Sequence, residues 1–226
     1  EPLTISEVRF GVHLSAVKLS DGSYGIASTL EDNGGHCLKK NRDFEEFTPA
    51  KIVGQKVIDL FETTKKSIIV DTLKIAVLNA ISSTILNEGN YKIRENIDPI
   101  ELVDLTQKKT ITIVGAFHSY IQKISETDNK LHVLELDENA LVDEYKKFYA
   151  PANEYQAVLP ESDVVIITGL TLVNNTIDGL LSAISPDALV IVTGPSSSLI
   201  PDVLFQNKVN IIGATKITNP EILFNI

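Results

Sequence analysis

Cysteine, methionine and positive charge are scarce in this sequence. Its 226 residues contain one cysteine, Cys37, and no methionine. A single cysteine excludes an internal disulfide and is typical of a reducing compartment. Acidic residues outnumber basic ones by 30 to 20, which gives a net charge of −10. Because nucleic acids and anionic membrane surfaces both attract basic proteins, this charge argues against either as a partner.

The sequence also lacks an uninterrupted hydrophobic run of the roughly 18 residues that would span a bilayer. The nearest approach is residues 67–86, where Asp71, Lys74 and Asn79 interrupt the apolar pattern. No signal-peptide pattern opens the sequence. We therefore expect a cytoplasmic protein with no membrane association.

Motifs that identify a reaction are absent as well. The sequence has no nucleophile elbow, no phosphate-binding P-loop, no HExxH helix and no recognisable pair of catalytic carboxylates. Its composition, 43% hydrophobic and 22% charged, is that of an ordinary globular protein. The sequence thus leaves open whether the protein is an enzyme, and it does not exclude a homo-oligomer.

The most informative pattern that is present is a β-branched apolar run ending in glycine. It occurs four times, as ITIVG at 111–115, VVIITG at 164–169, LVIVTG at 189–194 and VNIIG at 209–213. Runs without polar alternation are typical of strands buried on both faces of a parallel sheet. The carboxyl ends of parallel strands share one edge, and ligands of open α/β sheets bind at that edge. The four glycines therefore predict where a site lies.

The pattern divides the sequence into two domains of the α/β class. Residues 1–90 predict a small α+β domain, residues 91–108 a linker, and residues 109–226 a Rossmann-like domain with about five parallel strands. In the first domain we expect a hairpin of strands 9–19 and 24–29, a helix from Thr48 to about Phe61, and a central helix over 68–87 that is apolar on most sides. In the second we expect helices near 119–125, 139–148, 176–183 and 199–206.

Polar side chains follow the strand that ends at Gly169. Thr171, Asn174 and Thr176 crowd the start of the next predicted helix. One interpretation is that this cluster caps the helix and is otherwise solvated. The other, which we favour, is that these hydroxyl and amide groups bind a polar ligand at the helix N-terminus.

The next strand is followed by Gly194, Pro195, Ser196 and two further serines. A glycine–proline break with serines before an apolar helix is typical of an anion-binding turn. A serine N-cap after a proline turn explains the same residues nearly as well. Because this loop and the one after Gly169 are expected side by side, we interpret them as one site.

A dinucleotide site is only half present. Gly115 is followed by Ala116-Phe117-His118, not by the three-glycine turn of NAD-binding sites. Glu135 ends the next strand about 20 residues on, where such folds place an acid that binds ribose. Glu135 is therefore a candidate ligand contact or, equally, a surface ion-pair residue, and NAD is not expected.

Adjacent His36 and Cys37 could ligate a soft metal. No second His/Cys pair has the spacing of a zinc site, so an ordinary loop is the favoured interpretation. Lys39, Lys40 and Arg42 form a short basic cluster that could hold an anion or lie in solvent.

Four stretches together resemble the putative heavy-metal chelation family: GVHLSAVKLSDGSYGIAST, CLKKNRDFEEFTP, ITGLTLVNNTIDGLL and VTGPSSSLIPDVLF. The resemblance covers nearly the whole chain. It implies an enolase N-terminal-like domain joined to a Rossmann-like domain, with a ligand site in the cleft between them. It also implies that the residues of the two polar loops, with Gly115 and Glu135, line this cleft, and that His36, Arg42 and Asp43 contribute from the first domain.

Three hypotheses follow. The leading one is a protein that binds a small polar or anionic ligand, a divalent or heavy metal ion or a metal chelate between its domains. The second is an enzyme that uses a nucleotide-type cofactor such as S-adenosylmethionine, with Glu135 on the ribose. The third is a scaffold or regulatory module whose cleft is vestigial.

Overall fold

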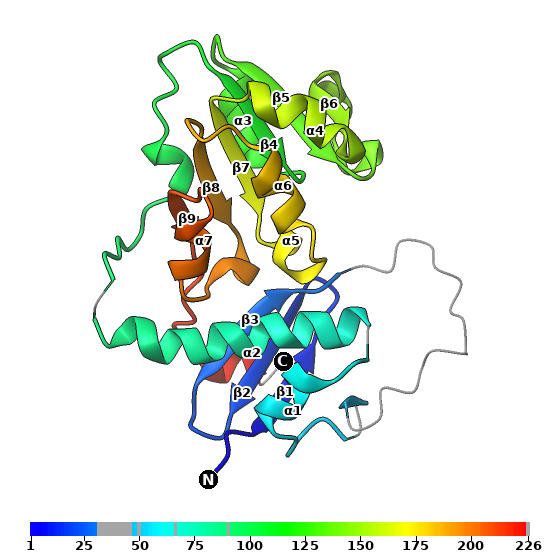
Figure 1. The fold of residues 1–226 in the computed structure, drawn as a ribbon, viewed down its shortest axis with the longest axis vertical. Helices are drawn as coiled ribbons and strands as arrows, with labels where there is room; N and C mark the ends of the chain where they lie inside the picture. The colour runs from blue at the N-terminus through cyan, green and yellow to red at the C-terminus, as the bar shows by residue number, and fades with distance from the viewer. Residues whose placement is uncertain (31–46, 49–50, 66, 90, 225–226) are drawn as a thin grey trace.

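The structure is a computed structural model, and it describes residues 1–30, 47–48, 51–65, 67–89 and 91–224. It contains a three-stranded antiparallel sheet and a six-stranded parallel sheet (Figure 1). A long helix, α2, lies between the two sheets. The mixed α/β class expected from the sequence is confirmed.

The small sheet has the order β1 (Ile5–Phe10), β2 (Leu14–Leu19), β3 (Tyr24–Ser28). The predicted β2–β3 hairpin is present, and its turn is fixed by Asp21, whose Oδ1 accepts from Ser23 N at 2.9 Å. The predicted single strand over 9–19 is wrong. It is two strands, because the chain reverses at Gly11, whose N–H donates to Leu14 O.

The first helix, α1 (Val57–Glu62), begins nine residues after the predicted start at Thr48. The reason is that the preceding chain belongs to the small sheet. Ile5 N donates to Gln55 O, and Gly54 N donates to Ile5 O. Backbone groups committed to β1 cannot also form a helix.

Helix α2 (Ile68–Asn87) has the predicted bounds, and Ser67 Oγ caps it by accepting from Val70 N at 3.1 Å. Its apolar residues Val70, Leu73, Val77 and Ala80 pack against the small sheet. The opposite face meets α5 and the loop after β8. By length and composition α2 could span a membrane, but its two packed faces already account for its apolar character.

The large sheet is parallel throughout. Its strands are β4 (Thr110–Val114), β5 (Lys130–Glu135), β6 (Tyr149–Pro151), β7 (Val164–Thr168), β8 (Leu189–Thr193) and β9 (Ile211–Gly213), in the order β6-β5-β4-β7-β8-β9. All four glycine-ended runs are parallel strands of this sheet, as predicted, and they lie side by side as β4, β7, β8 and β9. The strand missed from the sequence is β6, which is only three residues long.

Short helices connect the strands. The α-helices are α3 (His118–Ser125), α4 (Tyr155–Val158), α5 (Leu170–Val173), α6 (Ile177–Ala183), α7 (Asp202–Gln206) and α8 (Pro220–Phe224). The 3₁₀ helices are η3 (Pro99–Leu102), η4 (Glu138–Ala140), η5 (Asp143–Phe148), η6 (Ala152–Glu154), η7 (Leu159–Glu161) and η8 (Pro195–Ser197). The helix predicted over 139–148 is therefore replaced by two 3₁₀ segments, and the one over 199–206 starts only after Pro201.

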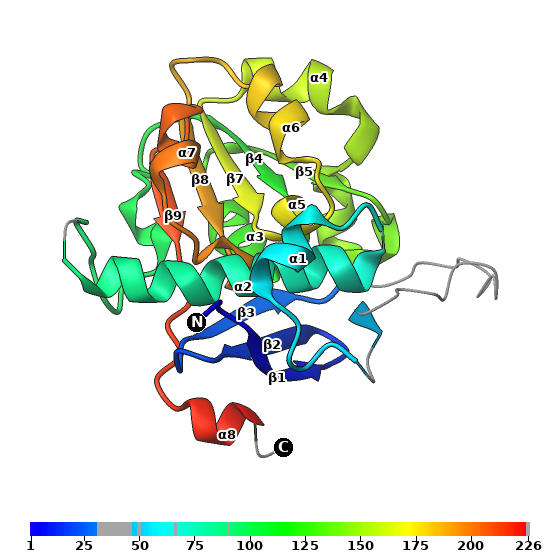
Figure 2. The same ribbon diagram turned by 60° about the horizontal axis from the view of Figure 1, so that its bottom comes forward.

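Two segments lie away from their expected domain. Ile100 and Val103, in the expected linker, are buried in the cluster that covers one face of the parallel sheet. The C-terminal helix α8 leaves the parallel sheet and packs under the small sheet, on the face opposite α2 (Figure 2). The two halves of the chain are therefore interleaved.

We expect Gly25→Ala to destabilise the protein. A Cβ at Gly25 would overlap the backbone of α2 at Ala76 O and Ala80 N. Neither atom can move without shifting the helix, so we expect a loss of about 3 kcal/mol in the free energy of unfolding, measured by urea denaturation. As control, Gly179→Ala on the exposed face of α6 should change stability by less than about 1 kcal/mol. Equal stability of both variants would contradict the close packing of β3 on α2.

Candidate functional site

The carboxyl edge of the parallel sheet brings three glycine turns into contact. Strand order reverses between β4 and β7, which is the position where open α/β sheets bind ligands. Gly115, with φ +106°, lies here, and a Cβ on it would be 3.1 Å from Thr168 Cγ2. A Cβ on Gly169 would lie 3.0 Å from Ser197 N, and one on Gly194 3.7 Å from Gly169 N. The loops predicted to converge therefore do meet.

The amide nitrogens of these glycines are used within the sheet. Gly115 N donates to Leu134 O, Gly169 N to Thr193 O and Gly194 N to Gly213 O. They therefore hold the edge together and are not available as ligand donors in this conformation. The remaining candidates for contacts to a ligand at this edge are the polar side chains.

The side chains after Gly169 are bonded locally. Thr171 is buried, and its hydroxyl donates to Thr168 O at 2.7 Å. Asn174 Oδ1 accepts from the backbone N–H and the hydroxyl of Thr176, at 3.2 and 2.6 Å. Thr176 is the N-cap residue of α6, but its side chain makes no capping bond. This loop thus makes part of the edge, with its hydroxyls already satisfied.

The loop after Gly194 contacts the small sheet. Ser196 is fully buried, and its Oγ accepts from Ser28 N of β3 at 2.8 Å. The hydroxyl of Ser197, also buried, donates to Gly194 O and Gly213 O. Pro195 is half-buried. This predicted anion-binding turn is therefore a junction between the two halves of the protein.

Asn79 of α2 is central to this junction, and sequence reasoning did not select it as a site residue. Its Nδ2 donates to Ile26 O at 2.7 Å, to Ser196 O at 3.2 Å and to Pro195 O at 3.3 Å. Three residues further on, Ser82 Oγ accepts from Ile200 N at 2.9 Å. The signal in the sequence was a polar stripe at helical spacing within an apolar helix, Thr72, Asn79 and Ser82.

Two buried polar atoms of that stripe have no hydrogen-bond partner in the described part of the chain, the hydroxyl oxygen Thr72 Oγ1 and the acceptor Asn79 Oδ1. Asn79 is only 2% exposed. The orientation of its amide is fixed, because turning it over would point Oδ1 at three carbonyl oxygens. An orphaned buried acceptor is uncommon and marks a place where a donor from outside the chain would be stabilising.

Glu135 lies at the end of β5, on the same edge as Gly115. It is half-buried, and its Oε1 accepts from Leu136 N at 2.6 Å. His118, which follows the first glycine turn, uses its Nε2 to contact Ala140 O at 2.8 Å and has its ring 6.4 Å from that of Tyr145. These contacts are local, so they orient Glu135 and His118 without linking them to the junction.

A further polar pair lies beside this edge. The hydroxyl of Tyr120, a buried residue of α3, donates to Asp98 Oδ1, which also accepts from Ile100 N. Burial, followed by the bond to Asp98, raises the pKa of the Tyr120 phenol well above its usual range. The phenol therefore stays protonated, and it ties η3 to α3.

The remaining predicted contacts, His36, Cys37, Arg42 and Asp43, lie outside the described residues. Among the residues that the structure does describe, no group of three or more His, Cys, Asp or Glu side chains could hold a metal ion. The hydroxyl, amide and carbonyl groups of the junction are also poor ligands for soft heavy metals, which prefer thiolate and imidazole.

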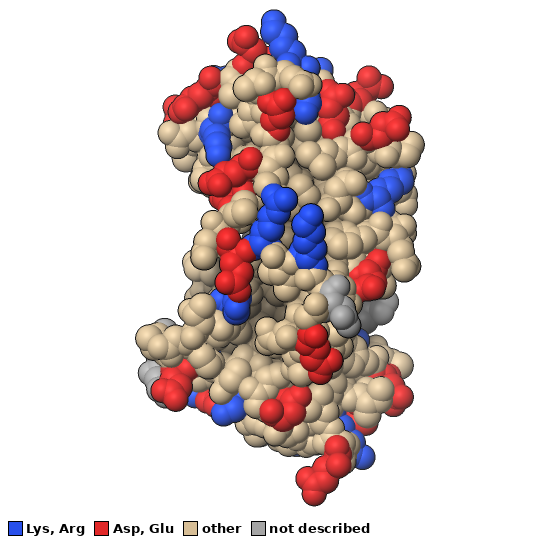
Figure 3. Space-filling view, turned by 90° about the vertical axis from the view of Figure 1, so that its left-hand side faces the viewer, with Lys and Arg blue, Asp and Glu red and all other residues tan. Residues whose placement is uncertain are grey.

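The outer surface of the protein carries hollows. Figure 3 shows a depression between the upper and lower parts of the molecule, with Lys and Arg side chains beside it. A hollow of about 290 Å³ is lined by Ile26 and by residues of the C-terminal segment, and one of about 610 Å³ by Glu1–Thr4, Ser20 and Asp21. Neither of these two hollows is lined by the glycine turns.

Comparison with known proteins gives consistent matches along the chain. Two family models, both described as putative heavy-metal chelation, match residues 1–82 and 98–226. An uncharacterised protein from Methanocaldococcus jannaschii is 31% identical over 201 residues, which are 85% of this chain and 70% of the relative.

Solved structures show the same fold. A protein of unknown function from Pyrococcus horikoshii superposes with a TM-score of 0.76 at 24% identity, covering 98% of this chain and 84% of its own. One from Desulfitobacterium hafniense gives 0.68 at 20% identity, covering 92% and 79%. Both carry the family name of the model that matches residues 98–226.

We expect Asn79→Ala to destabilise the protein by about 2 kcal/mol, because it leaves the buried carbonyl of Ile26 and those of Pro195 and Ser196 without their donor. Urea denaturation measures the change. The matched control is Asn153→Ala, at an exposed position of η6, which should stay within about 0.5 kcal/mol of the original protein. If Asn79→Ala behaves like the control, Asn79 does not hold the junction.

Proposed function

The chain belongs to the putative heavy-metal chelation family, and from this premise we propose that it binds a small polar or anionic ligand, such as a metal chelate. The proposed site lies where the two halves of the chain meet, at the carboxyl edge of the parallel sheet. Relatives in this family are uncharacterised. The proposal therefore depends on the chemistry of the junction itself.

The single observation that carries the proposal is the concentration of polar groups around the loop after β8, at the carboxyl edge of the sheet. Ser28 N–H and Asn79 Nδ2 donate across the junction, to Ser196 Oγ and to carbonyls of its loop. Asn79 Oδ1 lies among them, buried and without a partner in the described residues. A ligand that carries both acceptors and donors could accept from Ser28 N–H, from Asn79 Nδ2 and from the freed Ser196 hydroxyl, and could donate to Asn79 Oδ1. The exchange costs least when the ligand or water also supplies donors to the loop carbonyls that Asn79 leaves, because an unpaired buried carbonyl is destabilising.

A chelate fits this chemistry better than a bare metal ion. The described residues supply no cluster of metal ligands, whereas amide and hydroxyl donors suit the carboxylates or phosphates of an anionic chelator. A bound metal would then be held mainly by the small molecule. His36 and Cys37 are proposed as auxiliary soft ligands, and Arg42 and Asp43 as further contacts to the small molecule.

The alternative proposal is a nucleotide-type cofactor such as S-adenosylmethionine. It is favoured by the strand order, which is the one in which Rossmann folds bind nucleotides, and by Glu135 at the end of the second strand of that sheet. Against it stands the turn after Gly115, which has the fold's first glycine but not the others.

A thermal-shift series distinguishes the two, because only ligands that bind the native state raise its melting temperature. The probes are zinc chloride, citrate, zinc citrate, adenosine and S-adenosylmethionine. We expect stabilisation by citrate or zinc citrate and little by zinc alone. Stabilisation by the adenine compounds only, lost in Glu135→Ala, would support the cofactor instead.

The location of the site is tested by Ser196→Ala. Removing this hydroxyl should cost about 1 kcal/mol of stability, since Ser28 N loses its acceptor. It should also weaken binding of the stabilising probe by about tenfold, measured by calorimetry, a factor equivalent to one hydrogen bond of about 1.4 kcal/mol. Ser182→Ala, on the exposed surface of α6, is the control. Unchanged affinity in Ser196→Ala would place the ligand elsewhere.

A further inference from the structure

The chain returns to its N-terminal half after completing the parallel sheet. Residues 214–224, which we call the strap, leave β9 without regular structure and end in α8. On the way, Thr215 N donates to Ser198 Oγ at 2.9 Å, and Lys216 Nζ pairs with Glu95 at 2.7 Å. The strap then crosses to the outer face of the three-stranded sheet (Figure 2).

The strap supplies apolar contact between the halves. Of the four buried apolar clusters formed by described residues, two lie wholly within residues 98–224 and one wholly within residues 1–89. The fourth joins the halves. In it Phe224, 7% exposed, packs with Ala16 and Ile26 of the small sheet, flanked by Leu14, Tyr24, Ile217 and Leu223.

The contacts across the junction on the other side of the small sheet are of a different kind. There the hydrogen bonds of Ser28, Asn79 and Ser82 to residues 195–200 connect the halves. Polar contacts of this type exchange readily with water, so domains joined by them tend to move relative to each other. The apolar contacts under the strap cannot be replaced by contacts to water in this way. Opening the cluster would expose Phe224 and the sheet face to water, which is unfavourable.

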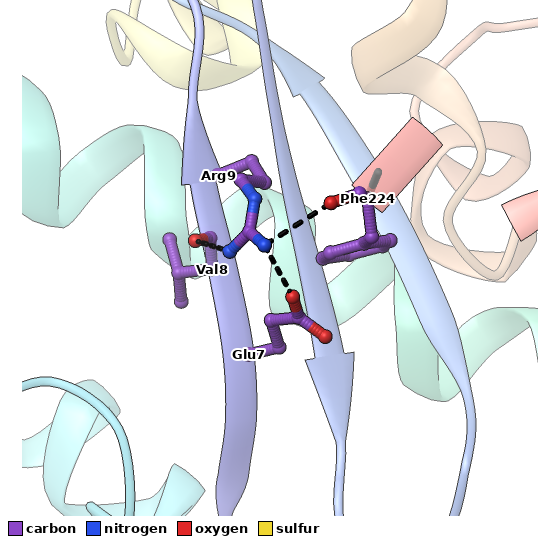
Figure 4. A network of polar contacts seen from close by, with 4 residues as sticks. All are labelled: Glu7, Val8, Arg9 and Phe224. Carbon is purple, nitrogen blue, oxygen red and sulfur yellow. Dashed lines mark hydrogen bonds and ion pairs between the residues drawn. The ribbon is translucent and has the colours of Figure 1, made fainter. Parts of the chain in front are cut away.

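A polar clasp fixes the end of the strap. The guanidinium group of Arg9 on β1 donates to Phe224 O at 3.1 Å and to Val8 O at 3.2 Å, and pairs with Glu7 at 2.6 Å (Figure 4). Its Cζ also lies 5.8 Å from the centre of the Phe224 ring. Arg9 thereby holds both the backbone and the ring of the terminal helix against the sheet.

We propose that the strap is a conformational latch: its packing against the small sheet sets how far, and how often, the two halves separate at the Asn79–Ser196 junction. The latch does not depend on the identity of any ligand. It acts on the bonds of Ser28, Asn79 and Ser82, which break when the halves part.

Hydrogen exchange on the full chain tests the latch in Phe224→Ala and, as a milder change at a partly exposed side chain, Arg9→Ala. The probes are the amides of Ser28 and Ile200, which donate across the junction, with the amides of β7 as internal reference. We expect exchange at Ser28 and Ile200 to accelerate by about tenfold or more in Phe224→Ala and by a smaller factor in Arg9→Ala, with β7 unchanged.

Two controls match these variants. Phe205→Ala removes a phenylalanine that is 49% exposed on α7, and Arg94→Ala removes an exposed arginine outside the strap. Both should leave the Ser28 and Ile200 amides unchanged. Acceleration confined to residues 220–224 would overturn the proposal, since the strap would then fray without moving the junction. Equal acceleration in all segments, β7 included, in both strap variants would overturn it as well, because the strap would then contribute only to global stability.

Discussion

The structure depends on the hydrogen bonds that a single amide makes from the middle of a buried helix. Helix α2 packs against two different surfaces, an apolar sheet face on one side and a polar loop on the other. Asn79 does so by donating from one nitrogen to Ile26 O of β3 and to the carbonyls of Pro195 and Ser196. Because these acceptors come from both halves of the chain, this side chain, together with Ser28 and Ser82, ties α2 and the small sheet to the loop after β8.

This division of α2 determines how the two halves are joined. The face that carries Leu73, Val77 and Ala80 forms a core with the small sheet, so the helix and that sheet behave as one unit. The polar face gives a contact with the parallel sheet whose bonds can be exchanged for bonds to water or to a ligand. A buried apolar cluster that joins the halves lies on the far side of the small sheet, under Phe224. The protein thus combines a polar junction with an apolar latch.

The local parts of this arrangement could be predicted from the sequence. Apolar runs rich in Val and Ile identified four parallel strands, and the mostly apolar character of residues 68–87 identified a central helix. Prediction failed where contacts with residues far away in the sequence set the local structure. Residues 54–55 pair with β1, so α1 begins later than predicted, and the three-residue strand β6 forms by pairing with β5. The convergence of the loops after Gly115, Gly169 and Gly194 follows from parallel topology. That Ser196 is covered by β3 does not, because nothing near residue 196 encodes its contact with residue 28.

The same geometry bears on the chemistry that the family description implies. Chelation of a soft heavy metal needs thiolate or imidazole ligands, and the sequence has one cysteine and four histidines. The described histidines do not form a cluster with acidic residues, and the junction offers amides, hydroxyls and carbonyls. The amide and hydroxyl groups can recognise an organic anion through hydrogen bonds, and they would hold a soft metal only when such an anion carries it. A junction that opens and closes around Asn79 is then suited to a ligand that must be enclosed to be held, since burial strengthens each of those hydrogen bonds.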